Sequence, residues 1–314
     1  MSPQIVAAGR EDWPELPLAA WQDTYNTLHM WSQIVGKVRL ALSPKLNHWW
    51  EVPLYVDAVG LTTSAIPYAG GIFEIKFDFM HHKLLIETSH AATKTLDLAP
   101  RSVADFYREF MAALASLGIE VKIWTMPCEI PNPIPFDEDT EHASYDAEYA
   151  NRFWRILVSA DAIFKEFRAG FIGKASPSHF FWGSFDLAVT RFSGRRAPAR
   201  DGADVITREA YSHEVISSGW WPGSGDIRQA AFYTYAAPEP PGFGQHPVNP
   251  SQASYDPQLK EFLLMYDDVR QASSPRSMLL EFMQSTYDAG ANLGKWDRKE
   301  LERAPQSIDP AGLV

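Results

Sequence analysis

Three of the 9 histidines in this chain stand where an imidazole could do chemistry. His48 and His179 each precede two aromatic residues, in "HWW" and "HFF", and each is predicted to enter a β-strand. His213 is expected inside another strand, on one face with Tyr211 and Val215. A neutral imidazole can act as a base or bind a metal near pH 7. These histidines suggest acid–base catalysis or a His-ligated metal site, with hydrogen bonds to backbone carbonyls as the structural alternative.

Asp186 is the second candidate, because it lies within the long apolar run "SHFFWGSFDLAVTRFSG". We predict one strand over 178–194, whose alternation gives Asp186 three neighbours on its own face: Trp182, Ser184 and Thr190. A carboxylate in such surroundings is costly unless it is paired, and Arg191 or Arg195 is the expected partner. Asp186 is therefore either one half of a structural ion pair or a functional acid or base.

These candidates lead to a functional hypothesis, a small-molecule-binding protein or enzyme. The chain holds 18 Phe, 12 Tyr and 11 Trp, and aromatic walls with a few polar groups are typical of ligand pockets. We expect an aromatic-lined pocket near the strands of the second half. The predicted catalytic residues are Asp186, His213 and His179. The predicted ligand-binding residues are Arg191 for an anionic group, Trp182 and Trp220 for stacking, and His48.

Two alternatives stay open beside this hypothesis. A metal enzyme would use His48, His179 and His213 as ligands. A non-enzymatic interaction or scaffold protein would instead use the aromatic residues and a Pro/Gly-rich loop at 238–257 as a partner surface. The nucleotide-binding glycine motifs, H-E-x-x-H, C-x-x-C and G-x-S-x-G do not occur, and the sequence indicates no particular cofactor.

Composition limits the partners and the compartment. The net charge is −11, and an acidic surface disfavours nucleic acid, whose binding depends on phosphate neutralisation. No window approaches ~18 uninterrupted apolar residues and the first residues do not resemble a signal peptide, so we expect neither a membrane span nor secretion. The single cysteine, Cys128, cannot form an intramolecular disulfide, which favours the cytoplasm. A small anionic or aromatic ligand remains the expected partner.

Hydrophobic periodicity predicts an α+β fold. Amphipathic patterns indicate helices over 17–36, 102–118, 144–171, 257–270 and 275–294. Alternating or β-rich runs indicate strands over 37–44, 48–63, 71–80, 82–89, 119–126, 178–194, 210–221 and 230–238. A proline-rich connector over 127–142 is the predicted boundary between a first half, 1–130, and a second half, 131–314.

The two halves share an order of features. A helix, then Gly-Lys, then Ser-Pro, then His followed by two aromatic residues occurs as Gly36-Lys37 to His48 and again as Gly173-Lys174 to His179. We interpret this as an internal duplication of an α–β(3–4)–α unit with mainly antiparallel strands. Two such units packed into one body would leave a crevice where they meet.

The motifs "NHWW" and "SHFFWGSFDLAVTRFSGR", with "YSHEV", "GWWPG" and "YAAPEPPGF" downstream, carry a resemblance. In them the chain resembles a bacterial family of proteins of unknown function, over nearly its whole length from Trp13 to Arg303. The resemblance implies one shared architecture and no particular activity.

Overall fold

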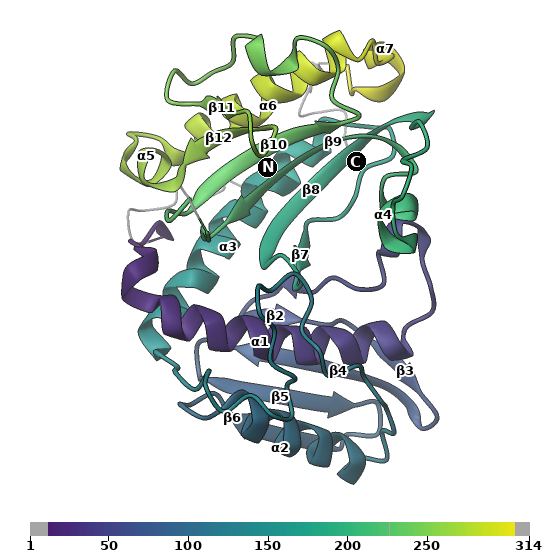
Figure 1. Ribbon diagram of the computed structural model, residues 1–314, viewed down its shortest axis with the longest axis vertical. Coiled ribbons are helices and arrows are strands. Elements are labelled where there is room, and N and C mark those ends of the chain that lie inside the picture. The colour runs from purple at the N-terminus through teal and green to yellow at the C-terminus, as the bar shows by residue number, and fades with distance from the viewer. Residues whose placement is uncertain (1–11, 226, 305–314) are drawn as a thin grey trace, which may run out of the picture.

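Two antiparallel sheets of six strands, each accompanied by long helices, form the part of the chain that the computed structural model describes, residues 12–225 and 227–304 (Figure 1). The fold is therefore α+β, as the sequence predicts. None of the helices in these residues is both long and apolar enough to cross a membrane.

The first sheet lies between the helices α1 (Leu18–Leu42) and α2 (Val103–Ser116) in the sequence. Its strands are β1 (Tyr55–Val56), β2 (Gly60–Thr62), β3 (Ile66–Tyr68), β4 (Gly71–Asp78), β5 (Lys83–Thr88) and β6 (Thr93–Asp97). They follow the order β1-β2-β4-β5-β6, and β3 also pairs with β4. The two helices pack together through Trp31 of α1, which stacks on Phe106 of α2 at 4.6 Å between ring centroids. Ser102 accepts a hydrogen bond from the Asp105 backbone N–H and so caps α2 where the sequence predicts its start.

The second sheet follows the helix α3 (Ala147–Ala169), which Asp146 caps. Its strands are β7 (His179–Phe181), β8 (Asp186–Arg196), β9 (His213–Trp221), β10 (Ala231–Ala237), β11 (Ser254–Asp256) and β12 (Glu261–Met265). They lie in the order β11-β12-β10-β9-β8-β7. The remaining helices are α4 (Val205–Ala210), α5 (Tyr266–Gln271), α6 (Pro275–Leu293) and α7 (Arg298–Leu301), with single 3₁₀ turns η2 (Asn47–Trp49) and η3 (Phe243–Gln245).

A large hydrophobic core runs through both halves, and Phe153 of α3 contacts aromatic rings of both. The Phe153 ring contacts Phe79, which follows the first sheet strand β4, with 6.3 Å between centroids. It also stacks on Phe185 of the second half at 5.0 Å and contacts Trp220 of β9 at 5.9 Å. The halves also meet through a backbone bridge between Leu54 and Phe180.

Two predicted strands near the first sheet are wrong, and one set of contacts accounts for the second. Residues 37–42 continue helix α1, and residues 119–126 form no strand. The buried Lys37 ammonium donates hydrogen bonds to the carbonyl oxygens of Trp124 (3.1 Å) and Met126 (2.5 Å). A lysine side chain thus satisfies carbonyls that a strand would have paired with a neighbouring strand.

Two further predictions fail in the second half. The strand predicted over 178–194 is a hairpin, because a turn at 182–185 with Phe185 in the left-handed region (φ 59°) separates β7 from β8. The helix predicted over 257–270 consists of strand β12 and the short helix α5. Phe262, Leu263 and Leu264 are all buried in β12, and a short apolar run of this kind fits a buried strand as well as a helix.

The markers of the proposed duplication do not occupy equivalent places. Gly36 lies inside helix α1, whereas Gly173 lies four residues beyond the last residue of α3. His48 belongs to the turn η2 and not to a strand as predicted, whereas His179 begins β7. Each half nevertheless has the order long helix, antiparallel sheet, helix.

Candidate functional site

The second sheet has one face covered by helices and one face that carries most of its polar side chains. Helices α3 and α6 cover the first face (Figure 1). On this face Thr286 of α6 donates a hydrogen bond to Thr234 of β10 (3.1 Å). Alternation along the strands places five polar side chains on the opposite face, which we call the open face: Asp186, Thr190, Ser217, Tyr233 and Tyr235. Thr190 and Ser217 are hydrogen-bonded across β8 and β9 at 2.9 Å.

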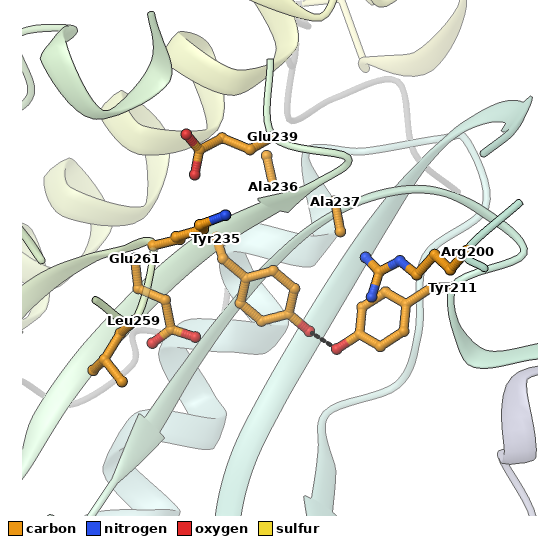
Figure 2. Close-up of a pocket in the computed structure, with 9 residues that line it drawn as sticks. Arg200, Tyr211, Tyr235, Ala236, Ala237, Glu239, Leu259 and Glu261 are labelled. Atoms are coloured by element: carbon orange, nitrogen blue, oxygen red, sulfur yellow. Dashed lines mark hydrogen bonds between the residues drawn. The ribbon is translucent and has the colours of Figure 1, made fainter. Parts of the chain in front are cut away.

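A pocket of about 440 Å³ lies on the open face beside Tyr235 (Figure 2). Its lining residues come from β10, β12 and the segments that flank β9 and β10, namely Arg200, Tyr211, Tyr235, Ala236, Ala237, Glu239, Leu259, Lys260 and Glu261. The hydroxyl groups of Tyr211 and Tyr235 are hydrogen-bonded at 3.0 Å. The Arg200 guanidinium lies over the Tyr211 ring, 4.2 Å from its centroid. The pocket therefore offers two aromatic rings, a cation and a phenol pair to one ligand.

Two carboxyl groups at or near the pocket lie in surroundings that favour their protonated form. Burial, with the nearby Asp186 and Asp256 carboxylates, raises the pKa of Glu261 to about 7. Burial also raises the pKa of Asp186, although Ser184 and Tyr233 both donate hydrogen bonds to its carboxylate. The Tyr233 ring in turn stacks on Tyr235 at 6.2 Å, which links Asp186 to the pocket wall. Glu261 and Glu239 are the acids that line the pocket, and Asp186 is not among its lining residues.

A second group of residues on the same face, which we call the histidine–aromatic cluster, adjoins the pocket and consists of His48, Trp50, Lys174, Phe192 and His213. The His48 ring lies 5.4 Å from Trp50, 4.8 Å from Phe192 and 5.7 Å from His213. Its Nε2 is 2.6 Å from Lys174 Nζ. Trp50, Tyr211 and Tyr235 pack against one small apolar cluster formed by Phe192, Val215 and Ala237, so the cluster and the pocket share a wall.

His179 is buried beside Trp50, the member of this cluster whose ring it contacts. Its ring contacts Trp50 at 5.5 Å and Tyr55 at 5.6 Å. Both ring nitrogens are buried without a hydrogen-bond partner in the described residues. Burial, with the charges of Arg39 and Arg168, lowers the pKa of His179 to about 3, so the imidazole is neutral at physiological pH.

The three histidines do not form the predicted metal site. Trp50 separates His179 from His48, and His48 Nδ1 is directed at the backbone carbonyls of Glu209 and Ala210 (3.1 and 3.2 Å). Across residues 12–225 and 227–304, no three His, Cys, Asp or Glu side chains are grouped so that they could bind one metal ion. The described residues therefore offer no set of ligands for the metal site that the sequence left open.

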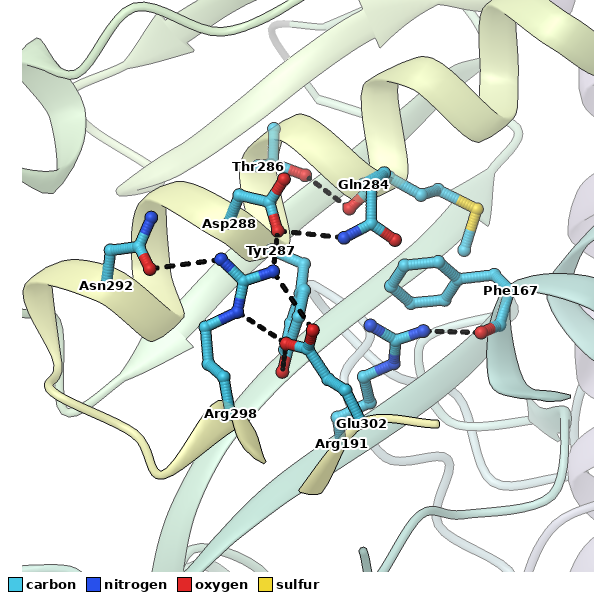
Figure 3. Close-up of polar contacts among 10 residues, drawn as sticks. Phe167, Arg191, Gln284, Thr286, Tyr287, Asp288, Asn292, Arg298 and Glu302 are labelled. Carbon is cyan, nitrogen blue, oxygen red and sulfur yellow. Dashed lines mark hydrogen bonds and ion pairs between the residues drawn. The ribbon is translucent and has the colours of Figure 1, made fainter. Parts of the chain in front are cut away.

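Arg191 occupies a different place from the one predicted. It lies on the helix-covered face of β8, fully enclosed, and donates a hydrogen bond to the Phe167 carbonyl (Figure 3). Its guanidinium stacks 3.4 Å from the Phe167 centroid and 4.3 Å from that of Tyr287. Since Asp186 faces the other side of the sheet, the predicted ion pair between them is wrong, and Arg191 cannot reach a ligand in the open-face pocket. Burial lowers the pKa of Arg191 to about 10, opposed by Tyr287, Glu302 and Asp288.

The other predicted partner and the two predicted stacking residues are also placed elsewhere. Arg195 binds Glu214 (2.6 Å) and not Asp186. Trp220 is fully buried on the helix-covered face, in contact with Phe153 and Tyr266, and belongs to the core. Trp182 is buried in the turn after β7, where its Nε1 donates to the Val52 carbonyl at 2.7 Å.

Residues that the sequence analysis did not select supply most of the site. Tyr235, Tyr211, Glu261 and Arg200 line the pocket, and Lys174 contacts His48. One signal was available for the tyrosines, because the alternation in "AFYTYAA" puts Tyr233 and Tyr235 on one face of a predicted strand. Glu261 was hidden by the predicted helix over 257–270.

Comparisons with known proteins identify a family over nearly the whole chain. Residues 13–303 match a family described as "Family of unknown function (DUF5996)". No curated protein and no solved structure matches the chain.

Proposed function

The chain belongs to the DUF5996 family, for which no function is established, and we propose that it binds a small anionic or aromatic molecule in the open-face pocket. The observation that carries this proposal is the pairing of two tyrosine rings with Arg200 around a volume of about 440 Å³. Volumes of about 300–1,000 Å³ with aromatic walls and a few polar groups are typical of small-molecule sites.

The charges around the pocket favour a ligand with an anionic group. Arg200 and Lys260 line it, and neither forms an ion pair within the part of the chain that the structure describes. The lining carboxyl groups are Glu261 and Glu239, and Glu239 already accepts a hydrogen bond from the Tyr255 hydroxyl at 2.6 Å. The Arg200 guanidinium can donate two parallel hydrogen bonds to a carboxylate or phosphate. Glu261, with a pKa of about 7, opposes a bound anion less than an ordinary carboxylate would, because it is half protonated at neutral pH.

The alternative of an interaction protein has less support. Among the described residues, the exposed large hydrophobic side chains are spread over several elements, and Trp124 is the one aromatic residue among them. A partner surface would gather such side chains into one patch.

Two further inferences, on cellular location and on the origin of the two halves, accompany the proposal. We infer a cytoplasmic location from the single cysteine, whose thiol pKa is raised by burial and by Glu129, so it stays protonated. We also infer that the two halves arose by duplication, since α1 packs on α2 as α3 packs on α6. Cell fractionation tests the first inference.

Native mass spectrometry of the freshly purified protein tests the proposal first, because it detects a retained ligand. Titration with benzoate and larger aromatic carboxylates, followed by calorimetry, then measures affinity directly. We expect Arg200→Ala and Tyr235→Ala each to weaken binding about tenfold or more, since a hydrogen bond to a charged group is worth about 1.5–3 kcal/mol.

Arg208→Ala is the matched control, because Arg208 is an exposed arginine of the neighbouring helix α4 that does not line the pocket. It should leave affinity unchanged. Equal effects of Arg200→Ala and Arg208→Ala, or no binding by any member of the series, would overturn the proposal.

A further inference from the structure

Lys174 is the lysine of the histidine–aromatic cluster, and its ammonium group contacts an imidazole in place of a carboxylate. Its Nζ lies 2.6 Å from His48 Nε2, 4.9 Å from the centroid of Phe192 and 5.1 Å from that of Trp50. No ion pair to Lys174 occurs among residues 12–225 and 227–304. Lys45, by contrast, is paired with Glu209 at 2.9 Å.

The tautomer of His48 follows from its other contacts. Its Nδ1 faces the carbonyl oxygens of Glu209 and Ala210, and a carbonyl oxygen only accepts hydrogen bonds. Nδ1 therefore carries the proton, and Nε2 of the neutral ring presents its lone pair to Lys174. Burial, followed by the charge of Lys174, lowers the pKa of His48, which keeps the ring neutral. The arrangement is an amine, a base within hydrogen-bond reach, and a backbone group that orients the base.

Backbone geometry holds both residues in place. His48 and Trp49 are consecutive non-glycine residues in the left-handed region, at φ 61° and 60°. Such conformations are unfavourable and persist where the surroundings impose them, most often at functional sites. Lys174 is held by the hydrogen bond that its carbonyl accepts from Phe192 N–H (3.0 Å), next to the bridge between Ala175 and Arg191.

We propose that Lys174 is an amine nucleophile that forms an imine with small aldehydes or ketones, while His48 accepts the proton that its ammonium group must lose. The Nζ lone pair attacks the carbonyl carbon, the C=O π electrons move to oxygen, and the oxygen takes up the proton that the attacking nitrogen loses, which gives a carbinolamine. The carbinolamine then loses water as the C=N bond forms, so the balance is amine plus carbonyl compound to imine plus water. No oxidant or reductant takes part.

The surroundings of Lys174 support this role and indicate the substrate class. Burial lowers the pKa of Lys174 and increases its free amine at neutral pH. This burial is only partial, because the residue as a whole is exposed, so a ligand can reach it. Trp50 and Phe192 offer ring faces, which favour a carbonyl compound with an apolar or aromatic substituent.

Trapping with benzaldehyde and sodium cyanoborohydride tests the proposal on the full chain at pH 7. The reductant converts the imine to a stable secondary amine, and peptide mass spectrometry measures the rate at each lysine. Lys45 is the internal control, because its Nζ also lies over a tryptophan, Trp49, but is paired with a carboxylate. We expect labelling of Lys174 to be about tenfold faster than that of Lys45 or more, because its lowered pKa leaves more free amine at pH 7 and His48 accepts the proton that its ammonium group loses.

His48→Asn removes the imidazole base while keeping a residue type that tolerates the left-handed region. It should lower the rate at Lys174 to that of Lys45 and leave Lys45 unchanged. Equal rates at the two lysines of the wild-type chain, which need no variant, would overturn the proposal, as would a rate at Lys174 that His48→Asn does not change.

The outcome is independent of the pocket proposal. Arg200→Ala should leave Lys174 labelling unchanged, so either proposal can fail alone.

Discussion

Asp186 and Glu261 share an unusual environment, since both carboxyl groups lie on the open face and both have a raised pKa. A carboxyl group with a raised pKa binds its proton more tightly in the folded than in the unfolded chain. Between the two pKa values the folded chain holds more protons, so the free energy of unfolding falls as pH rises through that interval. For Glu261 the interval runs from 4.5 to about 7.

Glu261→Gln should remove this loss of stability. The neutral amide keeps the shape of the protonated side chain. The difference in free energy of unfolding between the variant and the wild type should therefore shift by about 1–2 kcal/mol in favour of the variant from pH 5 to pH 8. Urea unfolding at the two pH values measures the difference. Glu281→Gln, on the exposed side of α6, is the control and should behave like the wild type. A pH dependence identical in wild type and Glu261→Gln would contradict the assignment.

At the level of single residues, the sequence indicated that Asp186 needs a partner but not which one. A charge pattern points to arginines as partners for a buried carboxylate. The structure uses Tyr233 and Ser184 instead, because neutral donors suffice when burial has raised the pKa of the acid. His48 and His213, two of the three histidines selected from the sequence, are neighbours in the structure, whereas Lys174 had only the Gly-Lys pattern of the two halves to mark it. Its contact with His48 spans 126 positions, and no local pattern encodes it.

At the scale of elements, the turn between β7 and β8 depends on a glycine in the middle of helix α1. The Trp182 ring occupies the space next to Gly36, and a Cβ added there would lie 2.3 Å from the ring atoms Cδ1 and Nε1. Glycine inside a helix costs about 1 kcal/mol relative to alanine. The close approach of the Trp182 ring is the physical reason why position 36 requires glycine.

Gly36→Ala should therefore destabilise the protein, by about 1–3 kcal/mol, although alanine is the better helix former. A double-mutant cycle with Trp182→Ala isolates the cause. In the Trp182→Ala background the same substitution should become neutral or stabilising, measured by urea unfolding. A loss of the same size in both backgrounds would show that Trp182 is not responsible.

The elements most accurately predicted are those whose signals are local. Helices α2, α3 and α6 have a side-chain cap and a periodic apolar stripe, and their predicted bounds differ from the observed ones by a few residues. The elements missed depend on distant partners. Residues 119–126 have a strand composition but give their carbonyls to Lys37, and 261–265 becomes a strand because β10 lies beside it.

At the scale of the whole molecule, the hydrophobic core that both halves share should make them unfold together. Phe153 contacts rings of both halves, so Phe153→Ala should cost about 3–5 kcal/mol, the range for a buried phenylalanine. Unfolding followed by tryptophan fluorescence and by circular dichroism should give one coincident transition in the wild type and in the variant. Two separated transitions would show that the halves are independent domains.

The place of Phe153 also bears on how this chain could be divided. A cut in the proline-rich connector near residue 130 leaves Phe79 on one fragment and Phe153 on the other. Each fragment would then expose apolar surface that is buried in the intact chain. We expect neither fragment to be recovered alone from the supernatant of a cell lysate, whereas co-expression of the two should rescue both. On this expectation, the connector marks a boundary in the sequence but does not link two domains that fold separately.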